Sequence, residues 1–447
     1  MTFLQTYQRS SALTAVILGL ATACAAAPQT ETGPIAAIPA EPAPAAPTPA
    51  PSTPAPVTLP AFPASGHPDI DAWRVDFAQR AVSGGRDAAI VYATLRDLSP
   101  LAIYLEPTVK AAGIADQAEF AKPIWDYVDS AVSENRKTRG AEKLVEFDAV
   151  FDAIETRYGV DREALTAIWA METNLGSFIG THDAPNTLAN MAVEGRRQGF
   201  AENELLALMK MQERGDVARG DLTSGWAGAM GQTQFMPSTF LAYAVDFDGD
   251  GRKNLWSSAP DALASAANYL SASGYQSDQP WGVEVVTGRD FDWALADGQD
   301  RRLNTWKAAG LKPLHGPFPV DDFTYGQLWL PTGATGPKYL LFKNFHVFKT
   351  YNRSDSYAFS VGLLTDGVAG RDGPDAAWPT EIEMLTRTDI ETLQASLNAL
   401  GFDAGPVDGI AGRGTRAALQ RFQKARGLLA DGYPSKTALN DVLAAVG

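Results

Sequence analysis

A stretch near the amino terminus, residues 25–65, limits where this chain can fold. It consists mostly of Pro, Ala and Thr and has almost no large apolar residues. Such a composition buries too little apolar surface to offset the conformational entropy lost on folding, so it predicts an extended linker. At about 3 Å per residue, a linker of this kind could span on the order of 100 Å. Folded domains are therefore expected only after the linker, and the length of the chain permits two of them.

The residues before the linker have the pattern of a secretory signal. Arg9 is the only charge in residues 1–9, and the run SALTAVILGLATA, too short for a membrane span, follows it. Cys24, the only cysteine, comes next, as in lipoprotein signals where this cysteine is acylated. We expect a signal peptide at 1–23, lipidation of Cys24 and a lipid-anchored linker at 24–66, on the periplasmic side of the outer membrane. The alternative is ordinary cleavage after Ala23, which would leave a soluble periplasmic protein.

The segment DREALTAIWAMETNLG predicts an amphipathic helix that carries an acidic residue on its apolar stripe. Leu165, Ile168 and Trp169 fall at positions i, i+3 and i+4, and Glu172 at i+7. The stripe is expected to face a core. The alternative is that Glu172 turns off the end of the helix into water.

The ends of this helix bear on the chemistry of Glu172. Asp161 is the expected N-cap and Gly176 the expected stop, which places Glu172 in the last turn. Burial and the carbonyl groups of the helix end would both raise the pKa of its carboxyl group. A carboxyl group that stays protonated near neutral pH can donate to a glycosidic oxygen, so Glu172 is a candidate general acid.

The segment GWAGAMGQTQFMPSTF, residues 225–240, predicts a tight glycine-rich turn before a helix. Gly228 and Gly231 permit a close approach of the backbone, Gln234 supplies an amide, and Pro237 is suited to open the helix. Such a turn could form a polar cleft wall, although most turns of this kind only connect elements.

Several segments together resemble a known enzyme family. FAKPIWDYVDSAVS, METNLG, AGAMGQTQFMPSTF, DFDGDGRKNLW, ALASAANYL and YNRSDSYAFSVG follow one another in this order. Over about residues 70–362 they resemble the lytic murein transglycosylases of the B type, which are membrane-bound in many Gram-negative bacteria. The resemblance implies an α+β, mostly helical, lysozyme-like catalytic domain, expected at 67–375, that cuts the glycan strands of bacterial peptidoglycan.

The resemblance also implies roles for single residues. Glu172 matches the family's single catalytic acid/base. The positions that line the glycan cleft match Gln234, Tyr243, Tyr269, Tyr351 and Asn352. One position departs from the family, which usually has Ser directly before the aromatic-Ala-Gly-Ala-Met run, in reach of the catalytic Glu. Here that residue is Gly225, with Ser224 one step earlier, so either Ser224 substitutes through a shifted backbone or the contact is absent.

The implied reaction consumes no water and needs no cofactor. Glu172 would protonate the oxygen between N-acetylmuramic acid and N-acetylglucosamine, then accept the proton of the muramic acid C6 hydroxyl as it attacks C1. The product is a 1,6-anhydro ring. Two alternatives remain: a muramidase that uses water with Asp246 or Asp248 as second carboxylate, and a catalytically inactive scaffold that binds glycan.

An acidic run reproduces the first half of a calcium loop. Oxygen ligands stand at positions 1, 3 and 5 and Gly251 at position 6, but Ser257 replaces the Glu of position 12. Closure would come from a later Asp, as in the matching family members. The candidate ligands of a structural Ca²⁺ are Asp246, Asp248, Asp250, Arg252 and Asp261. The alternative is a solvated acidic turn.

The last residues, 386–447, predict a separate helical module. Leu393, Leu397 and Leu400 share one helix face, and Thr415, Ala418, Leu419 and Phe422 share another. An Asp-Gly turn precedes each later helix. The segment resembles the three-helix peptidoglycan-binding domain found beside many wall hydrolases; without the resemblance it would predict only a small helical bundle.

The composition limits the classes of molecule that the protein is expected to bind. The net charge of −15 argues against nucleic acid or anionic lipid as a direct partner, and the four histidines show no metal spacing. The expected partners are peptidoglycan glycan strands, the membrane through the lipid anchor only, and wall-synthesis proteins. Residues 281–341 predict short strands and loops without an assigned chemical role.

Overall fold

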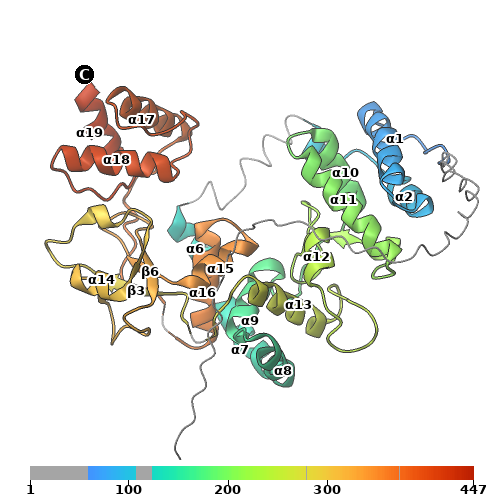
Figure 1. Cartoon of the computed structure of the whole chain (residues 1–447), viewed down its shortest axis with the longest axis horizontal. Coiled ribbons are helices and arrows are strands. Elements are labelled where there is room, and N and C mark those ends of the chain that lie inside the picture. The colour runs from blue at the N-terminus through green and yellow to red at the C-terminus, as the bar shows by residue number, and fades with distance from the viewer. Residues whose placement is uncertain (1–58, 107–122, 278, 372, 447) are drawn as a thin grey trace, which may run out of the picture. The chain divides into compact units, whose positions relative to one another are not determined.

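The computed structural model describes residues 59–106, 123–277, 279–371 and 373–446 (Figure 1). The expected signal peptide, Cys24 and most of the linker lie outside the described residues, as does the start of FAKPIWDYVDSAVS. The described part is mainly helical, with one five-stranded and one two-stranded sheet. The predicted fold class, α+β and mostly helical, is confirmed.

One group of helices surrounds a core that includes Phe77, Leu208 and Phe240. Pro237 opens the last of these helices, as predicted, because proline fits the first helical turn. The group consists of α1 (Pro68–Ser83), α2 (Ala88–Leu95), α3 (Ala102–Leu105), α10 (Ala184–Glu194), α11 (Gln198–Glu213) and α12 (Pro237–Tyr243). A 3-10 helix, Arg219–Asp221, and the short pair β1 (His182–Asp183) and β2 (Thr223–Ser224) lie between them in sequence.

A second group of helices surrounds α9 (Arg162–Thr173), the predicted helix of Glu172. It consists of α6 (Ile124–Ala131), α7 (Glu134–Glu146), α8 (Asp148–Tyr158), α13 (Ala259–Ala272), α15 (Lys343–Tyr351) and α16 (Asp355–Val368). Helix α9 packs against α7, α13 and α16, and every residue from Ala164 to Ala170 is buried. The prediction that Leu165, Ile168 and Trp169 face a core is confirmed. A helix buried on all sides gives Glu172 a rigid support.

Both ends of α9 differ from the prediction in detail. Asp161 is the N-cap residue but makes no capping hydrogen bond; its carboxylate accepts one from the Tyr275 hydroxyl at 2.8 Å instead. The helix ends at Thr173, before the predicted stop at Gly176, because Asn174 already adopts a left-handed conformation with φ 50°. Asn tolerates this conformation better than most residues.

The region predicted to contain short strands forms an antiparallel sheet of order β4-β6-β7-β3-β5. A third core lies against the sheet, and Trp306 is fully buried in it. The elements are β3 (Gly282–Val286), a 3-10 helix (Trp293–Leu295), β4 (Asp300–Arg302), α14 (Leu303–Ala308), β5 (Lys312–Pro313), β6 (Tyr325–Trp329) and β7 (Tyr339–Leu341).

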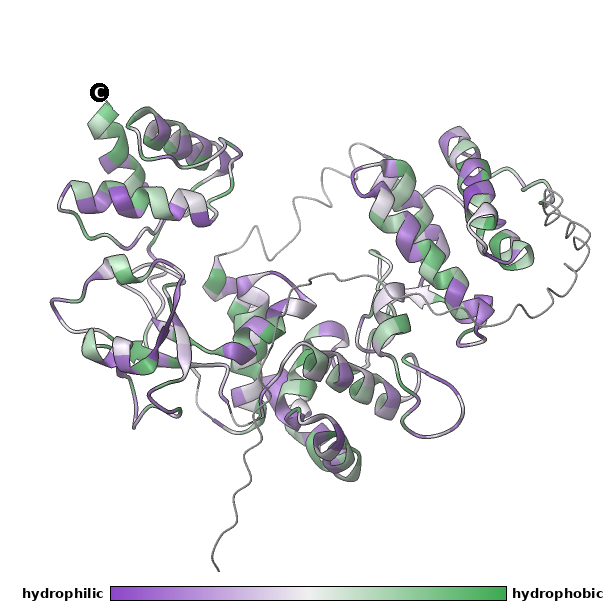
Figure 2. Ribbon diagram, in the orientation of Figure 1, coloured by the Kyte–Doolittle hydropathy of each residue, from purple (hydrophilic) through white to green (hydrophobic). Residues whose placement is uncertain are grey.

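The carboxy-terminal module has three helices, α17 (Arg387–Ala399), α18 (Arg413–Ala425) and α19 (Lys436–Val446). Hydrophobic and hydrophilic residues alternate along them (Figure 2), and the hydrophobic ones form a core of their own. Thr386 and Asp389 make a reciprocal capping box that begins α17. Leu393 and Leu397 lie in this core, and Leu400, at the C-cap of α17, packs against it.

Candidate active site

Glu172 and a tyrosine of a neighbouring helix form a carboxyl–hydroxyl pair. Glu172 lies in the last turn of α9 and Tyr357 in the first turn of α16, where the Ser354 side chain accepts a hydrogen bond from the Tyr357 backbone. The Tyr357 hydroxyl donates to Glu172 Oε1 at 2.5 Å. Burial raises the pKa of this hydroxyl well above its usual value, and the Glu172 carboxylate raises it further. Tyr357 therefore stays protonated at neutral pH and remains a donor to Glu172.

Three of the predicted glycan-binding residues, Tyr243, Tyr269 and Tyr351, form one aromatic cluster. They come from α12, α13 and α15, and the ring centroids of Tyr243 and Tyr269 are 5.0 Å apart and those of Tyr269 and Tyr351 5.3 Å apart, edge to face. The Tyr269 hydroxyl donates to the Thr350 carbonyl at 2.8 Å. The structure thus brings these three residues together.

Tyr351 connects the aromatic cluster with the carboxyl group. Its hydroxyl is buried, close to the Thr233 hydroxyl. Burial raises the pKa of this hydroxyl well above its usual value, and the charge of Glu172 is the next cause. Asn352 follows directly, at the end of α15, and its Oδ1 accepts a hydrogen bond from the Ser354 backbone at 3.1 Å. That bond holds Asn352 in the link between α15 and α16.

The backbone of the glycine-rich turn is packed so closely that a side chain at Gly231 would not fit. Gly231 has a φ of 67°, and a Cβ there would lie 2.6 Å from the Leu255 carbonyl oxygen. Gln234 is one of the few described non-glycine residues with positive φ, at 50°. Its Nε2 donates to the carbonyl oxygens of Gly231 at 2.9 Å and Ile179 at 3.4 Å. The turn therefore fixes the Gln234 side chain by its own backbone.

The structure shows the surroundings of Ser224 and Gly225. Ser224 is fully buried, and its hydroxyl contacts the carbonyl oxygens of Gly225 at 3.0 Å and His182 at 3.5 Å. A Cβ at Gly225 would lie 2.9 Å from Gln234 Oε1. The Gln234 amide thus occupies the space beside residue 225.

The acidic loop gathers three of the predicted metal ligands. Carboxylate oxygens of Asp246, Asp248 and Asp261 all lie within 4.8 Å of one another, whereas Asp250 is outside this group and its carboxylate accepts a hydrogen bond from the Arg252 backbone. Burial raises the pKa of Asp261, against backbone hydrogen bonds that lower it. Three converging carboxylates, one of them fully buried, fit a hard divalent cation such as Ca²⁺.

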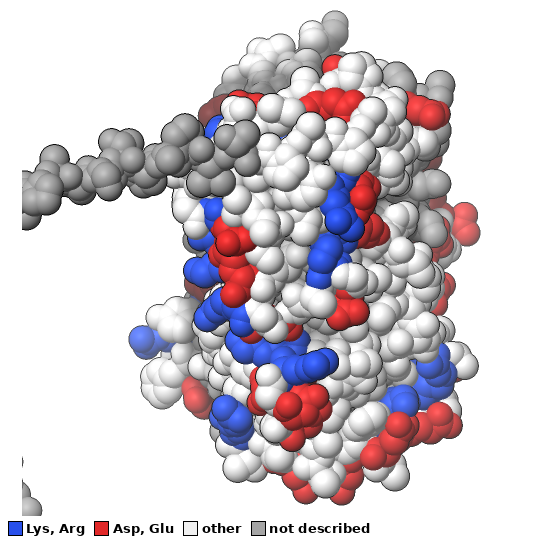
Figure 3. All heavy atoms as spheres, turned by 90° about the vertical axis from the view of Figure 1, so that its right-hand side faces the viewer, with Lys and Arg blue, Asp and Glu red and all other residues white. Residues whose placement is uncertain are grey.

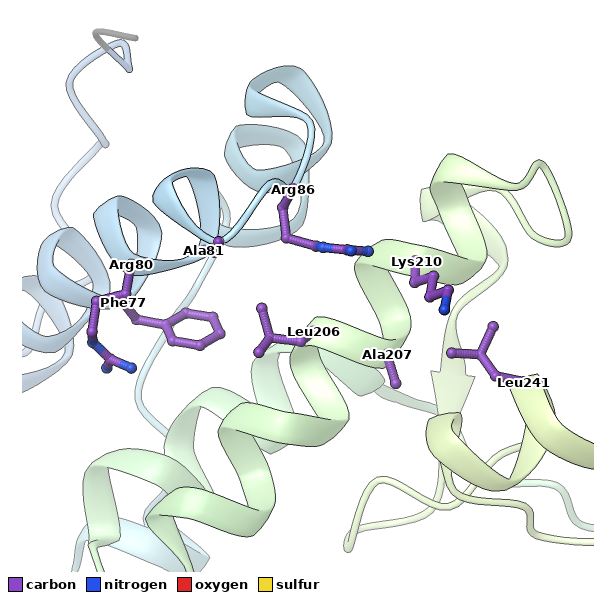
Figure 4. A pocket seen from close by; sticks show the side chains of 9 residues that line it. Phe77, Arg80, Ala81, Arg86, Leu206, Ala207, Lys210 and Leu241 are labelled. Carbon is purple, nitrogen blue, oxygen red and sulfur yellow. The ribbon is translucent and has the colours of Figure 1, made fainter. Parts of the chain in front are cut away.

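Two hollows lie away from these residues. One, of about 460 Å³, opens between α1, α11 and α12, with Phe77, Leu206 and Leu241 as apolar lining and Arg86 and Lys210 at its border (Figure 4). Basic and acidic side chains lie beside one another on the molecular face drawn in Figure 3. The other hollow, of about 800 Å³, is lined in part by aromatic residues of the sheet region. Neither hollow is lined by Glu172 or by another predicted site residue.

Tyr357 is the site residue that the sequence patterns did not single out. The signal that could have identified it is Ser354, a helix N-cap three residues earlier, followed by the apolar residues of α16. Together they place Tyr357 on the buried side of the first turn. Only the packing of α16 on α9, a contact between distant parts of the chain, shows what its hydroxyl reaches.

These features define a lysozyme-like helical domain with a supported carboxyl group, followed by a small helical module. Residues 69–366 match the family described as "Transglycosylase SLT domain", and residues 386–440 match "Putative peptidoglycan binding domain". The chain therefore belongs to the SLT-domain transglycosylases, and the predicted family is confirmed.

Named relatives agree with this assignment. The membrane-bound lytic murein transglycosylase B of Escherichia coli K12 is 34% identical over 219 residues, which are 47% of this chain and 58% of the relative. The matched part thus spans just over half of that protein. SltB3 from Pseudomonas aeruginosa, solved with NAG-anhNAM-pentapeptide, is 40% identical, with a TM-score of 0.79 over 84% of this chain and 100% of its own. Slt35 from Escherichia coli, solved with calcium, is 26% identical, with a TM-score of 0.56 over 68% of this chain and 93% of its own.

Proposed function

We propose that this protein cleaves the β-1,4 bond between N-acetylmuramic acid and N-acetylglucosamine in peptidoglycan and leaves 1,6-anhydromuramic acid ends. The observation that carries the proposal is the Glu172 carboxyl, held by the Tyr357 hydroxyl, in a chain of the SLT family. The SltB3 relative was solved with NAG-anhNAM-pentapeptide, a ligand that carries the expected anhydro sugar.

Glu172 acts first as acid and then as base. Protonated Glu172 donates to the bridging oxygen as the bond to C1 breaks, and the carboxylate formed accepts the proton of the C6 hydroxyl as its oxygen bonds to C1. The Tyr357 hydrogen bond to Oε1 stabilises the intermediate carboxylate. The sugar supplies the nucleophile itself, an intramolecular advantage that can reach about 7 kcal/mol or more.

Five residues bind the glycan in this proposal: Gln234, Tyr243, Tyr269, Tyr351 and Asn352. The tyrosine cluster offers aromatic edges and faces to the sugar rings. The Tyr351 ring belongs to this cluster and would contact a sugar through its ring.

The acidic loop holds a structural Ca²⁺ in this proposal, with Asp246, Asp248 and Asp261 as carboxylate ligands. Their spacing supports it, and so does the calcium in the solved Slt35 relative. Asp250 and the Arg252 carbonyl complete the predicted set, and Asp250 would have to turn inward to join it. The ion takes no part in the chemistry.

The remaining proposals concern organisation and place. The catalytic domain spans 67–375, and 386–447 bind the wall and concentrate the enzyme on it. Cys24 carries the lipid anchor after removal of residues 1–23. The name of the similar protein from Escherichia coli, which describes it as membrane-bound, supports this proposal. Among the described residues, no helix has both the length and the apolarity needed to cross a bilayer.

The test is whether a change at Glu172 separates cleavage from binding. Glu172→Gln keeps the shape of the side chain and removes its proton transfer, so release of soluble fragments from purified sacculi should stop while co-sedimentation with sacculi persists. Glu163→Gln, in the first turn of the same helix, is the matched control and should change neither.

Other outcomes would contradict the proposal. Continued release by Glu172→Gln would exclude Glu172 as the acid. Binding without release by the unaltered protein would leave the scaffold reading in its place.

A further inference from the structure

The backbone that follows Glu172 adopts an unfavourable conformation. Asn174 and Leu175 have φ values of 50° and 62°, directly after the end of α9. A residue with a Cβ is disfavoured in this left-handed region, Leu more than Asn, and helix ends fray readily. Glu172 lies in this last turn, so contacts from elsewhere in the fold must hold the turn together.

Gln232 makes two of those contacts. Its Oε1 accepts a hydrogen bond from Trp169 Nε1 at 3.1 Å, and its backbone carbonyl accepts one from Thr173 Oγ1 at 2.6 Å. Trp169 and Thr173 stand three residues before and one residue after Glu172. A single residue of the glycine-rich turn thus hydrogen-bonds to α9 both before and after Glu172 in the sequence.

The fit between Gln232 and the left-handed turn is close. Gln232 is only 6% exposed. Gly176 has a φ of 76°, and a Cβ at this position would lie 2.6 Å from Gln232 Oε1 and 3.3 Å from Trp169 Nε1. The Gln232 side chain therefore packs directly against the backbone that continues from α9.

Gln232 is itself anchored on its other side. Its backbone N–H donates to the Leu255 carbonyl at 2.8 Å, and its Nε2 contacts the Trp256 carbonyl at 3.4 Å. Trp256 Nε1 in turn donates to the Thr223 carbonyl at 2.9 Å. Gln232 joins the end of α9 to the segment that follows the acidic loop.

We infer that Gln232 is a positioning residue: it fixes the last turn of α9 and thereby the Glu172 carboxyl. The inference rests on the proposed function in taking Glu172 as the acid. Loosening this contact should lower kcat much more than it changes KM, because a misplacement of about 1 Å in a reacting group can cost on the order of a hundredfold.

Three variants test the inference on soluble glycan fragments. Gln232→Leu removes both side-chain hydrogen bonds at similar volume, and Trp169→Phe removes the indole donor together with part of a buried ring. Trp306→Phe is the matched control, because Trp306 is fully buried and its Nε1 donates to the Gly326 carbonyl at 2.8 Å in the separate core of the sheet region.

We expect Gln232→Leu to lower kcat by about ten- to a hundredfold with KM within about twofold, and Trp169→Phe to lower kcat by several-fold. The double variant should be no slower than Gln232→Leu, because both changes break the same contact. Trp306→Phe should keep the unaltered kcat. Each variant is first shown to be folded by its thermal unfolding curve.

An unchanged kcat for folded Gln232→Leu would overturn the inference, and so would losses in Gln232→Leu and Trp169→Phe that simply add. Equal losses in Trp169→Phe and Trp306→Phe would also do so, since they would reflect general destabilisation. These results differ from failure of the proposed function, which would appear as full activity of Glu172→Gln.

Discussion

At the scale of single residues, the hydrogen bond from the Tyr357 hydroxyl to Glu172 Oε1 leads to a testable prediction. A hydrogen bond to a carboxylate favours its ionised form and contributes about 1.5–3 kcal/mol. Tyr357→Phe should therefore lower kcat about tenfold or more and move the high-pH limb of the activity profile to higher pH, because loss of the donor favours the acid form of Glu172. The kcat/KM profile against pH on soluble fragments measures both effects, and an unchanged profile would show that the hydroxyl is only structural.

A second prediction at this scale concerns acid stability. Burial alone would raise the pKa of Glu202, but hydrogen bonds from Arg80, Gln198 and Trp73 outweigh it and lower the pKa from 4.5 to about 2. Because the folded pKa lies below the unfolded one, this stabilisation is full above about pH 4.5 and is lost as the pH falls towards 2. The free energy of unfolding in urea should fall less steeply over this range in Glu202→Gln; an equal slope would contradict the assignment.

Single residues also show which features of the site can be predicted from the sequence. The apolar stripe of α9 was predictable because helical period and burial are local properties, and it placed Glu172 in the last turn. The position of the Gln234 amide beside Gly225 could not be predicted from the sequence, because it depends on the left-handed backbone of Gln234 and on packing across the turn. The roles of the predicted glycan-binding residues remain predictions.

At the scale of elements, the acidic loop is the part whose stability should depend on a ligand. Ca²⁺ that binds only the folded state stabilises it by about 2.7 kcal/mol at a hundredfold excess over Kd. Millimolar Ca²⁺ should therefore raise Tm by several degrees, a chelator should reverse the change, and Asp248→Asn should abolish it, while Mg²⁺ should act weakly. An equal Tm with and without Ca²⁺ would identify a loop held by its own backbone hydrogen bonds.

The strand pairing of the five-stranded sheet could not be predicted from the sequence. Short strands in residues 281–341 were expected, but β7 pairs with both β6 and β3, and this register follows from contacts between distant segments. The three carboxy-terminal helices were more accessible, because each buries an apolar stripe in one small core. The predicted Asp-Gly turns precede α18 and α19, and Leu400 packs against the core from the C-cap of α17.

At the scale of the whole molecule, wall binding and cleavage should be separable. The carboxy-terminal module has a core of its own, so removal of residues 386–447 should leave the catalytic cores intact. The truncated protein should cleave soluble fragments with a kcat within about twofold and co-sediment with sacculi much less, because the glycan cleft alone would hold it. Undiminished co-sedimentation would assign wall binding to the catalytic domain.

In the proposed reaction the sugar's own C6 hydroxyl, and not water, attacks C1. Mass spectrometry of fragments released from sacculi in water enriched in heavy oxygen distinguishes the two nucleophiles. We expect 1,6-anhydromuramic acid ends without the heavy isotope, absent with Glu172→Gln. Reducing ends that carry the heavy oxygen would contradict the proposed reaction, because water would then be the nucleophile and a second carboxylate would be required.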